Sequence, residues 1–132
     1  MGTFALQLQE FVDLAKANTE TVVKKIGIEV LTGVVLKSPV DTGRFRANWV
    51  VGFDAVGKTS QATDKGGTQA IRRGTNEIMR VKLGETIWIS NSLPYARRLE
   101  YGWSGQAPNG MVRVTVAEWR SFIDKAVAEL KK

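Results

Sequence analysis

The chain has 132 residues, of which 43% are hydrophobic and 24% are charged, values typical of one globular domain. It contains no cysteine and no histidine, which excludes disulfides, zinc–thiolate sites, thiol nucleophiles and the commonest general base. The formal net charge is +6, which suits either nucleic acid or an acidic protein as a partner. No apolar run is long enough to cross a bilayer, and the start of the chain lacks a secretory signal. We therefore expect a soluble intracellular protein that is not an enzyme and has no membrane partner.

The first third of the sequence predicts a long helix followed by a strand. Apolar residues recur every three, four or seven positions from Phe4 to Val34, which predicts one helix over residues 4–37. Pro39 ends it, because a residue before proline is driven out of the helical region. Apolar and polar residues then alternate, which predicts a strand over residues 44–54. Residues 55–67 are rich in Gly, Ser and Thr and predict a flexible loop.

The remainder of the chain predicts shorter elements and a clear final helix. Thr115 and Glu118 have the spacing of a capping box, and an apolar stripe follows them. The fold class is therefore α+β, a single domain over residues 1–132 with a long N-terminal helix, a small and mostly antiparallel sheet and a C-terminal amphipathic helix. The predicted elements of this part are a helix over 68–83, a strand over 86–90, a short helix over 94–101, a loop over 102–112 and a helix over 116–131.

The four tryptophans fall into two groups. Trp49, Trp88 and Trp119 lie on apolar faces of predicted elements, so we expect them in the core. Trp103 lies in a loop bounded by glycines, and we expect it to be exposed. An exposed tryptophan is a common anchor of a protein interface.

One segment matches the phosphate-binding loop pattern G-x-x-x-x-G-K-[ST], with its fixed positions at Gly52, Gly57, Lys58 and Thr59. In a working site a helix begins at the lysine, because the free amides of the helix N-terminus hold the anion. Residues 60–67 are a poor helix start, and no apolar strand ending in aspartate follows to complete a metal site. We therefore interpret the match as a coincidence within a glycine-rich loop, and we expect no cofactor.

Carboxylates and arginines offer two further hypotheses. Asp41, Asp54 and Glu100 lack the spacing of a catalytic pair or metal site, and Asp41 is better suited to capping the turn at Thr42 and Gly43. Several arginines could bind nucleic acid together with an aromatic ring, although no segment matches a known nucleic-acid-binding motif. The preferred interpretation is a subunit interface. Its candidate residues are Arg44, Arg46, Arg72, Arg73, Arg97, Arg98 and Trp103.

Two separated stretches resemble a known family. Residues 38–46 (SPVDTGRFR) resemble the P-V-D-T-G-x-L-[RK] signature of neck and tail-completion proteins of tailed bacteriophages, with Phe45 in place of the common leucine. Residues 91–102 are similar to the N…YA…lEyG box of the same head–tail joining and tail-component proteins. The residues that carry the resemblance are Pro39, Asp41, Thr42, Gly43, Asn91, Tyr95, Ala96, Leu99, Glu100, Tyr101 and Gly102.

The resemblance implies a structural virion protein of the head–tail junction, made in the bacterial cytoplasm. Such subunits form a homo-oligomeric ring, six- or twelve-fold, around the channel through which DNA passes without sequence-specific binding. The implied neighbours are head-completion, tail-terminator or tail-tube proteins, and the two motifs are implied to set a turn and a helix-to-loop corner. Two alternatives stay open: a basic nucleic-acid-binding domain, and a nucleotide-binding protein that uses the loop from Gly52 to Thr59.

Overall fold

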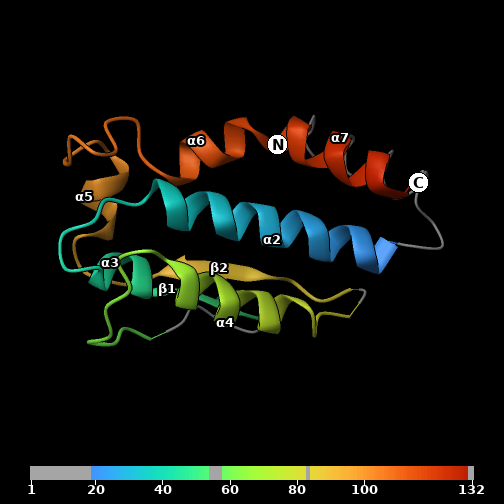
Figure 1. Ribbon diagram of the computed structural model, residues 1–132, viewed down its shortest axis with the longest axis horizontal. Helices are drawn as coiled ribbons and strands as arrows, with labels where there is room; N and C mark the ends of the chain where they lie inside the picture. The colour runs from blue at the N-terminus through green and yellow to red at the C-terminus, as the bar shows by residue number, and fades with distance from the viewer. Residues whose placement is uncertain (1–18, 54–57, 83, 131–132) are drawn as a thin grey trace.

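The computed structural model describes residues 19–53, 58–82 and 84–130 (Figure 1). Of the helix predicted over residues 4–37, the part before residue 19 lies outside the described residues. The elements in chain order are α2 (Thr19–Lys37), α3 (Arg44–Ala47), β1 (Trp49–Gly52), α4 (Thr68–Ile78), β2 (Trp88–Asn91), α5 (Ala96–Glu100), α6 (Val112–Ala117) and α7 (Trp119–Leu130).

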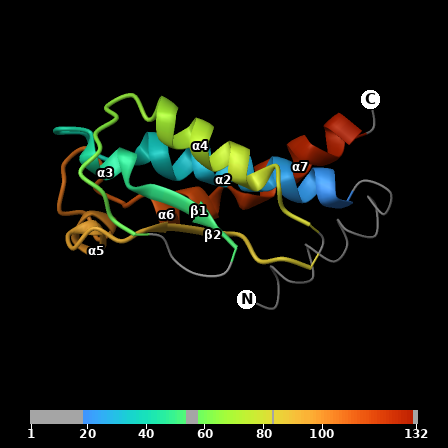
Figure 2. The same ribbon diagram turned by 90° about the horizontal axis from the view of Figure 1, so that it is seen from below.

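Helix α2 lies in the middle of the molecule. In Figure 1, α6 and α7 run along one side of it, and the sheet and α4 lie on the other side. Figure 2 shows the sheet and α4 in front of α2, with α6 and α7 behind it. Strands β1 and β2 pair antiparallel, with Trp49 opposite Asn91 and Gly52 opposite Trp88. The fold is α+β with a small antiparallel sheet, as the sequence predicted.

Helix α2 is apolar on more than one face because it packs against the sheet layer on one side and against α7 on the other. On the sheet side, α2 contributes Leu31, Val34 and Val35 to the main core. On the other side, Val22 and Ile26 of α2 pack against Ile123 and Ala126 of α7. Because both sides are covered, the burial of α2 joins the sheet layer to the C-terminal helices. The other fully or nearly buried members of the main core are Phe45, Trp49, Val51, Ala70, Ile78, Leu93, Ala107 and Met111.

The strand predicted over residues 44–54 is wrong in its first part. Residues Arg44–Ala47 form a helical turn, and the strand covers only Trp49–Gly52. Phe45 and Trp49 are four residues apart, a spacing that shares one side of a helix as well as one side of a strand. Their rings meet edge-on with centroids 5.9 Å apart. The alternating pattern therefore identified the buried side chains but not the backbone that carries them.

Three further elements differ from the predicted ranges, and one tryptophan is misplaced. The helix predicted over 68–83 ends at Ile78, the strand predicted over 86–90 covers Trp88–Asn91, and the helix predicted over 94–101 covers Ala96–Glu100. Trp88 is 44% exposed instead of buried. Side chains alternate between the faces of a strand, and only the face that carries Ile89 is turned to the core. Trp88 therefore points outward.

The predicted capping box at Thr115 is also wrong. Two helices, α6 and α7, replace the single helix over 116–131, and Thr115 lies inside α6. Its side chain is completely buried against Gly33 of α2, where a Cβ on the glycine would come within 2.8 Å of the threonine methyl group. The Thr115 hydroxyl has no hydrogen-bond partner among the described residues. Thr115 therefore packs α6 closely against α2 and does not cap a helix.

A Gly74→Ala substitution is expected to lower the free energy of unfolding. Gly74 of α4 is buried, and a Cβ there would overlap the Cδ2 atom of Leu31 and lie 2.9 Å from the Cγ2 atom of Val51. Overpacking of this kind costs about 1–3 kcal/mol, which outweighs the gain of about 1 kcal/mol in helix propensity. Urea unfolding measures the difference. Asn76→Ala on the exposed face of α4 is the control, and a stabilised Gly74→Ala variant would contradict the close packing.

A Thr115→Val substitution is expected to raise the free energy of unfolding by about 1 kcal/mol. Valine has nearly the same shape as threonine and removes a buried hydroxyl that lacks a partner. Thr115→Ser keeps the hydroxyl and loses the methyl group, so it should lower stability by about 1 kcal/mol. Thermal and urea unfolding of the two variants should move in opposite directions. A loss of stability in Thr115→Val would show that the hydroxyl has a partner.

Candidate subunit interface

The two sequence motifs meet at one end of the molecule, around α3 and α5 (Figure 1). The side-chain amide of Asn91 donates a hydrogen bond of 2.8 Å to the backbone carbonyl of Phe45. The rings of Phe45 and Tyr95 also lie close, with centroids 6.0 Å apart. The structure therefore brings together two stretches that are about fifty residues apart in the sequence.

The first motif forms a turn that requires glycine. Gly43 has a φ of 89°, and a Cβ there would lie 2.6 Å from the backbone nitrogen of Lys65. Its carbonyl accepts hydrogen bonds from the N–H groups of Ala47 and Asp64, at 3.0 and 2.9 Å. In the described part of the chain the side chain of Thr42, and not that of Asp41, accepts the backbone N–H of Arg44. The turn therefore starts α3 and fixes the loop that contains Asp64.

Two polar side chains next to this turn hold the surrounding backbone. The guanidinium of Arg46 donates to the carbonyls of Leu36, Ser38 and Lys65, so it satisfies carbonyls at the C-terminal end of α2. Asn48 is buried, and its amide exchanges hydrogen bonds with the backbone N–H and carbonyl of Ser60, at 2.7 and 3.2 Å. These contacts attach the described residues 58–67 of the long loop to α3.

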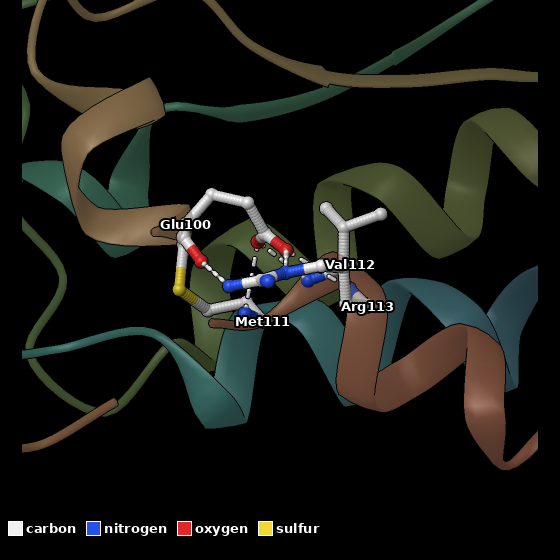
Figure 3. Close-up of polar contacts among 4 residues, drawn as sticks. All are labelled: Glu100, Met111, Val112 and Arg113. Carbon is white, nitrogen blue, oxygen red and sulfur yellow. Dashed lines mark hydrogen bonds and ion pairs between the residues drawn. The ribbon is translucent and has the colours of Figure 1, made fainter. Parts of the chain in front are cut away.

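The second motif positions a carboxylate at the start of α6 (Figure 3). The carboxylate of Glu100 accepts hydrogen bonds from the backbone N–H groups of Met111, Val112 and Arg113, at 2.9, 2.8 and 3.0 Å. The side chain of Arg113 returns two bonds, to the carboxylate at 3.2 Å and to the Glu100 carbonyl at 2.6 Å. A helix N-terminus has free N–H groups that need acceptors, and here a residue from another helix supplies them. We refer to this arrangement as the Glu100 clasp.

The electrostatics of the Glu100 clasp favour the ionised carboxylate. Partial burial raises the pKa of Glu100, but the hydrogen bonds from the three backbone N–H groups and from Arg113 together lower it more. The resulting pKa lies below the ordinary value of 4.5. The positive end of the helix dipole also stabilises a negative charge at this place. Glu100 is therefore charged at neutral pH and is occupied with the backbone of its own chain.

Glycines at both ends of the loop between α5 and α6 allow the backbone conformation that the clasp needs. Gly102 and Gly110 have φ values of 88° and 85°, which disfavour other residues. A Cβ on Gly102 would lie 2.6 Å from the carbonyl oxygen of Pro108, and one on Gly110 would overlap the carbonyl of Glu100. The clasp and these two glycines fix the loop that carries Trp103.

This loop and α5 present aromatic rings and arginines to solvent. Trp103 is 75% exposed and Tyr101 is 67% exposed. The guanidinium of Arg98 lies 5.5 Å from the centre of the Trp103 ring, and that of Arg113 lies 5.0 Å from the centre of the Tyr101 ring. A groove of about 320 Å³ separates the two motifs and is lined by Asp41, Arg44, Phe45, Tyr95, Arg98 and Trp103, among others.

The predicted interface arginines fall into three groups in the structure. Arg44, Arg46 and Arg73 donate side-chain hydrogen bonds to backbone carbonyls of their own chain. No described residue accepts a side-chain hydrogen bond from Arg97 or Arg98, which lie on α5 beside Trp103. Arg72 is exposed on α4, in another part of the fold. The interface prediction therefore concentrates on α5 and the loop that follows it.

The described residues after Gly57 do not form the helix that a phosphate-binding loop requires. Lys58 and Thr59 are exposed and lie outside any helix, and α4 does not begin until Thr68. Gly57 and Asp54 lie outside the described residues. Helix amides that could hold a phosphate are therefore not present at the lysine.

Sequence reasoning missed the role of Gln106. Its side-chain amide exchanges two hydrogen bonds with the backbone of Val40, accepting from the N–H at 2.9 Å and donating to the carbonyl at 3.0 Å. This contact links the loop after Gly102 to the first motif across 66 positions of sequence. No periodic or motif signal marks such a distant pair.

A comparison with protein families identifies the family that the two motifs resemble. The family model described as "Bacteriophage HK97-gp10, putative tail-component" matches residues 2–102, which include both motifs. The chain belongs to this family. Membership in the HK97-gp10 family supports a structural role in a tailed bacteriophage. No curated protein and no solved structure shows a significant match. None of the helices in the described ranges is long and apolar enough to span a membrane.

A Glu100→Gln substitution is expected to lower the free energy of unfolding by about 1–2 kcal/mol at pH 7, because an amide replaces a charged acceptor of helix N–H groups. The pKa of Glu100 is lowered in the folded state, so the unfolded state takes up the proton more readily. The stabilisation is thus present above pH 4.5 and is lost as the pH falls further.

Urea unfolding of wild type and Glu100→Gln between pH 3 and pH 7 tests this expectation. Glu77→Gln is the matched control, since Glu77 forms only an exposed pair with Arg80 and should change stability by less than about 0.5 kcal/mol. An equal effect of the two substitutions at pH 7, or a Glu100→Gln effect that persists undiminished at pH 3, would contradict the clasp.

Proposed function

We propose that the chain is a structural subunit of the phage head–tail junction, in a neck or tail-completion position. In this role it forms a homo-oligomeric ring around the DNA channel and docks on neighbouring head-completion, tail-terminator or tail-tube proteins. DNA passes through the ring without sequence-specific contacts. The subunit is made in the host cytoplasm and becomes part of the virion.

One observation carries the proposal: the motif residues maintain the shape of a protruding surface. Glu100 holds the first turn of α6, Asn91 connects the two motif stretches, and Gln106 ties the loop after Gly102 to the first motif. Their functional groups are engaged with the backbone of their own chain. The surface that results exposes Trp103 and Tyr101 with arginines beside them. Exposed aromatic residues with arginines are the typical anchors of protein interfaces.

A phage that lacks an intact copy of this gene is expected to produce DNA-filled heads and complete tails that do not stay joined. Electron microscopy of lysates and plaque counts measure this outcome. Wild-type protein supplied from a plasmid should restore joined particles. Lys58→Ala should restore them equally well, because the loop at Lys58 has no helix to form a phosphate site. Joined, infectious particles without the protein would overturn the proposal, and failure of Lys58→Ala would favour nucleotide binding.

A further inference from the structure

A second surface of the molecule, distinct from the one around Trp103, is an apolar groove of about 410 Å³. One wall comes from Val23, Ile26 and Val30 of α2, and the other comes from Ile87, just before β2, and from Ile89 within it. Trp119 of α7 also lines it. Glu85 is the one charged residue among the described residues that line the groove, and its side chain is exposed. The groove is therefore an apolar depression with a carboxylate at its rim.

The chemistry of Trp103 and Arg98 matches this groove. Trp103 is the most exposed of the large hydrophobic side chains in the described residues, and Arg98 lies over its ring. Hollows lie on both sides of the pair, one toward the first motif and one toward Tyr101, so the pair stands out as a knob. The Arg98 guanidinium has no hydrogen-bond acceptor in the described part of the chain. An apolar ring with a cation beside it is complementary to an apolar groove whose rim carries Glu85, one carboxylate oxygen of which accepts the backbone N–H of Lys82 at 2.7 Å.

We propose that the Trp103–Arg98 knob of one copy inserts into the apolar groove of the next copy, with Arg98 facing Glu85. This inference rests on the proposed ring and identifies the two surfaces that would build it. The knob and the groove lie toward opposite ends of the molecule: α5 is at one end of Figure 1, and the N-terminal half of α2 lies toward the other. The Glu100 clasp holds the knob in place, so it cannot reach the groove of its own copy.

The separation of the two surfaces determines the symmetry of the contact. Each copy offers one knob and one groove, which are different surfaces. In a head-to-tail arrangement such a contact is heterologous, and it forms a ring where the rotation between copies closes and a filament where it does not. A two-fold dimer in which each knob enters the groove of the other copy would use the same two surfaces, so the size of the assembly distinguishes a ring from a dimer. A ring is the assembly that the proposed channel requires.

Nucleic acid is a poorer occupant of the knob surface than protein is. Asp41 lines the same hollow as Trp103 and Arg98, and its exposed carboxylate would repel phosphate. Arg97 and Arg98 are the two arginines at this end whose side chains have no acceptor among the described residues. A duplex-binding protein typically makes about 6–10 phosphate contacts. A mixed pattern of charges around an aromatic ring suits a protein surface better.

Charge-reversal variants of Arg98 and Glu85 test whether these two residues pair between copies. Arg98→Glu and Glu85→Arg each place like charges at the contact, so each variant alone should need at least about tenfold more protein to assemble. An equimolar mixture should assemble again, because the altered knob of one variant fits the altered groove of the other. The double variant should also assemble. Trp103→Ala, which removes the anchor itself, should weaken assembly by about 30-fold.

Sedimentation velocity and native mass spectrometry of the purified full-length chain measure these assemblies, and circular dichroism checks that each variant is folded. Arg72→Glu is the matched control, since Arg72 is an exposed arginine on α4 outside both surfaces. Single variants that assemble like wild type, or a mixture that stays dissociated, would overturn the knob-and-groove contact. A wild-type chain that remains monomeric at micromolar concentrations would overturn it too. In each case, the presence of the protein in joined particles would leave the proposed function standing.

Discussion

The carboxylate of Glu100 determines the shape of the surface formed by α5 and the loop that carries Trp103. It holds the three N–H groups at the start of α6, and Arg113 closes the arrangement from the other side. The loop between α5 and α6 contains no helix or strand, so its conformation follows from this clasp, from Gly102 and Gly110, and from the bonds of Gln106 to Val40. Trp103 is exposed in a defined place for that reason. The carboxylate of Glu100 is thus occupied with backbone N–H groups of its own chain.

The frame behind this surface is built on α2. Close contacts at Gly33 and Gly74 let α6 and α4 approach from opposite sides, so that one helix joins both layers of the fold. Ion pairs from α2 to the C-terminal helices, such as Glu29 with Lys125 and Lys37 with Glu118, lie at the exposed margins and add little stability. Burial of apolar side chains on both sides of α2 holds the layers together. A rigid frame of this kind suits a subunit that presents fixed surfaces to its neighbours.

Sequence periodicity revealed the fold class and the elements with one buried face, but not the places where local chemistry overrides the pattern. The alternation around Phe45 predicted a strand, whereas the turn at Gly43 and the bonds of Asn48 enforce a helical turn. Trp88 was assigned to the core because a strand pattern does not say which of its two faces is covered. The roles of Glu100 and Gln106 depend on backbone groups far away in the sequence. Such contacts leave no periodic trace.

A cryo-EM map of the intact particle tests the central claim most directly. We expect a closed ring of copies of this chain at the head–tail junction. In that map the side chain of Trp103 should be buried against the next copy, with Arg98 close to Glu85. A particle that lacks the chain would contradict the structural role. A ring in which the α5 end of every copy faces solvent would contradict the interface.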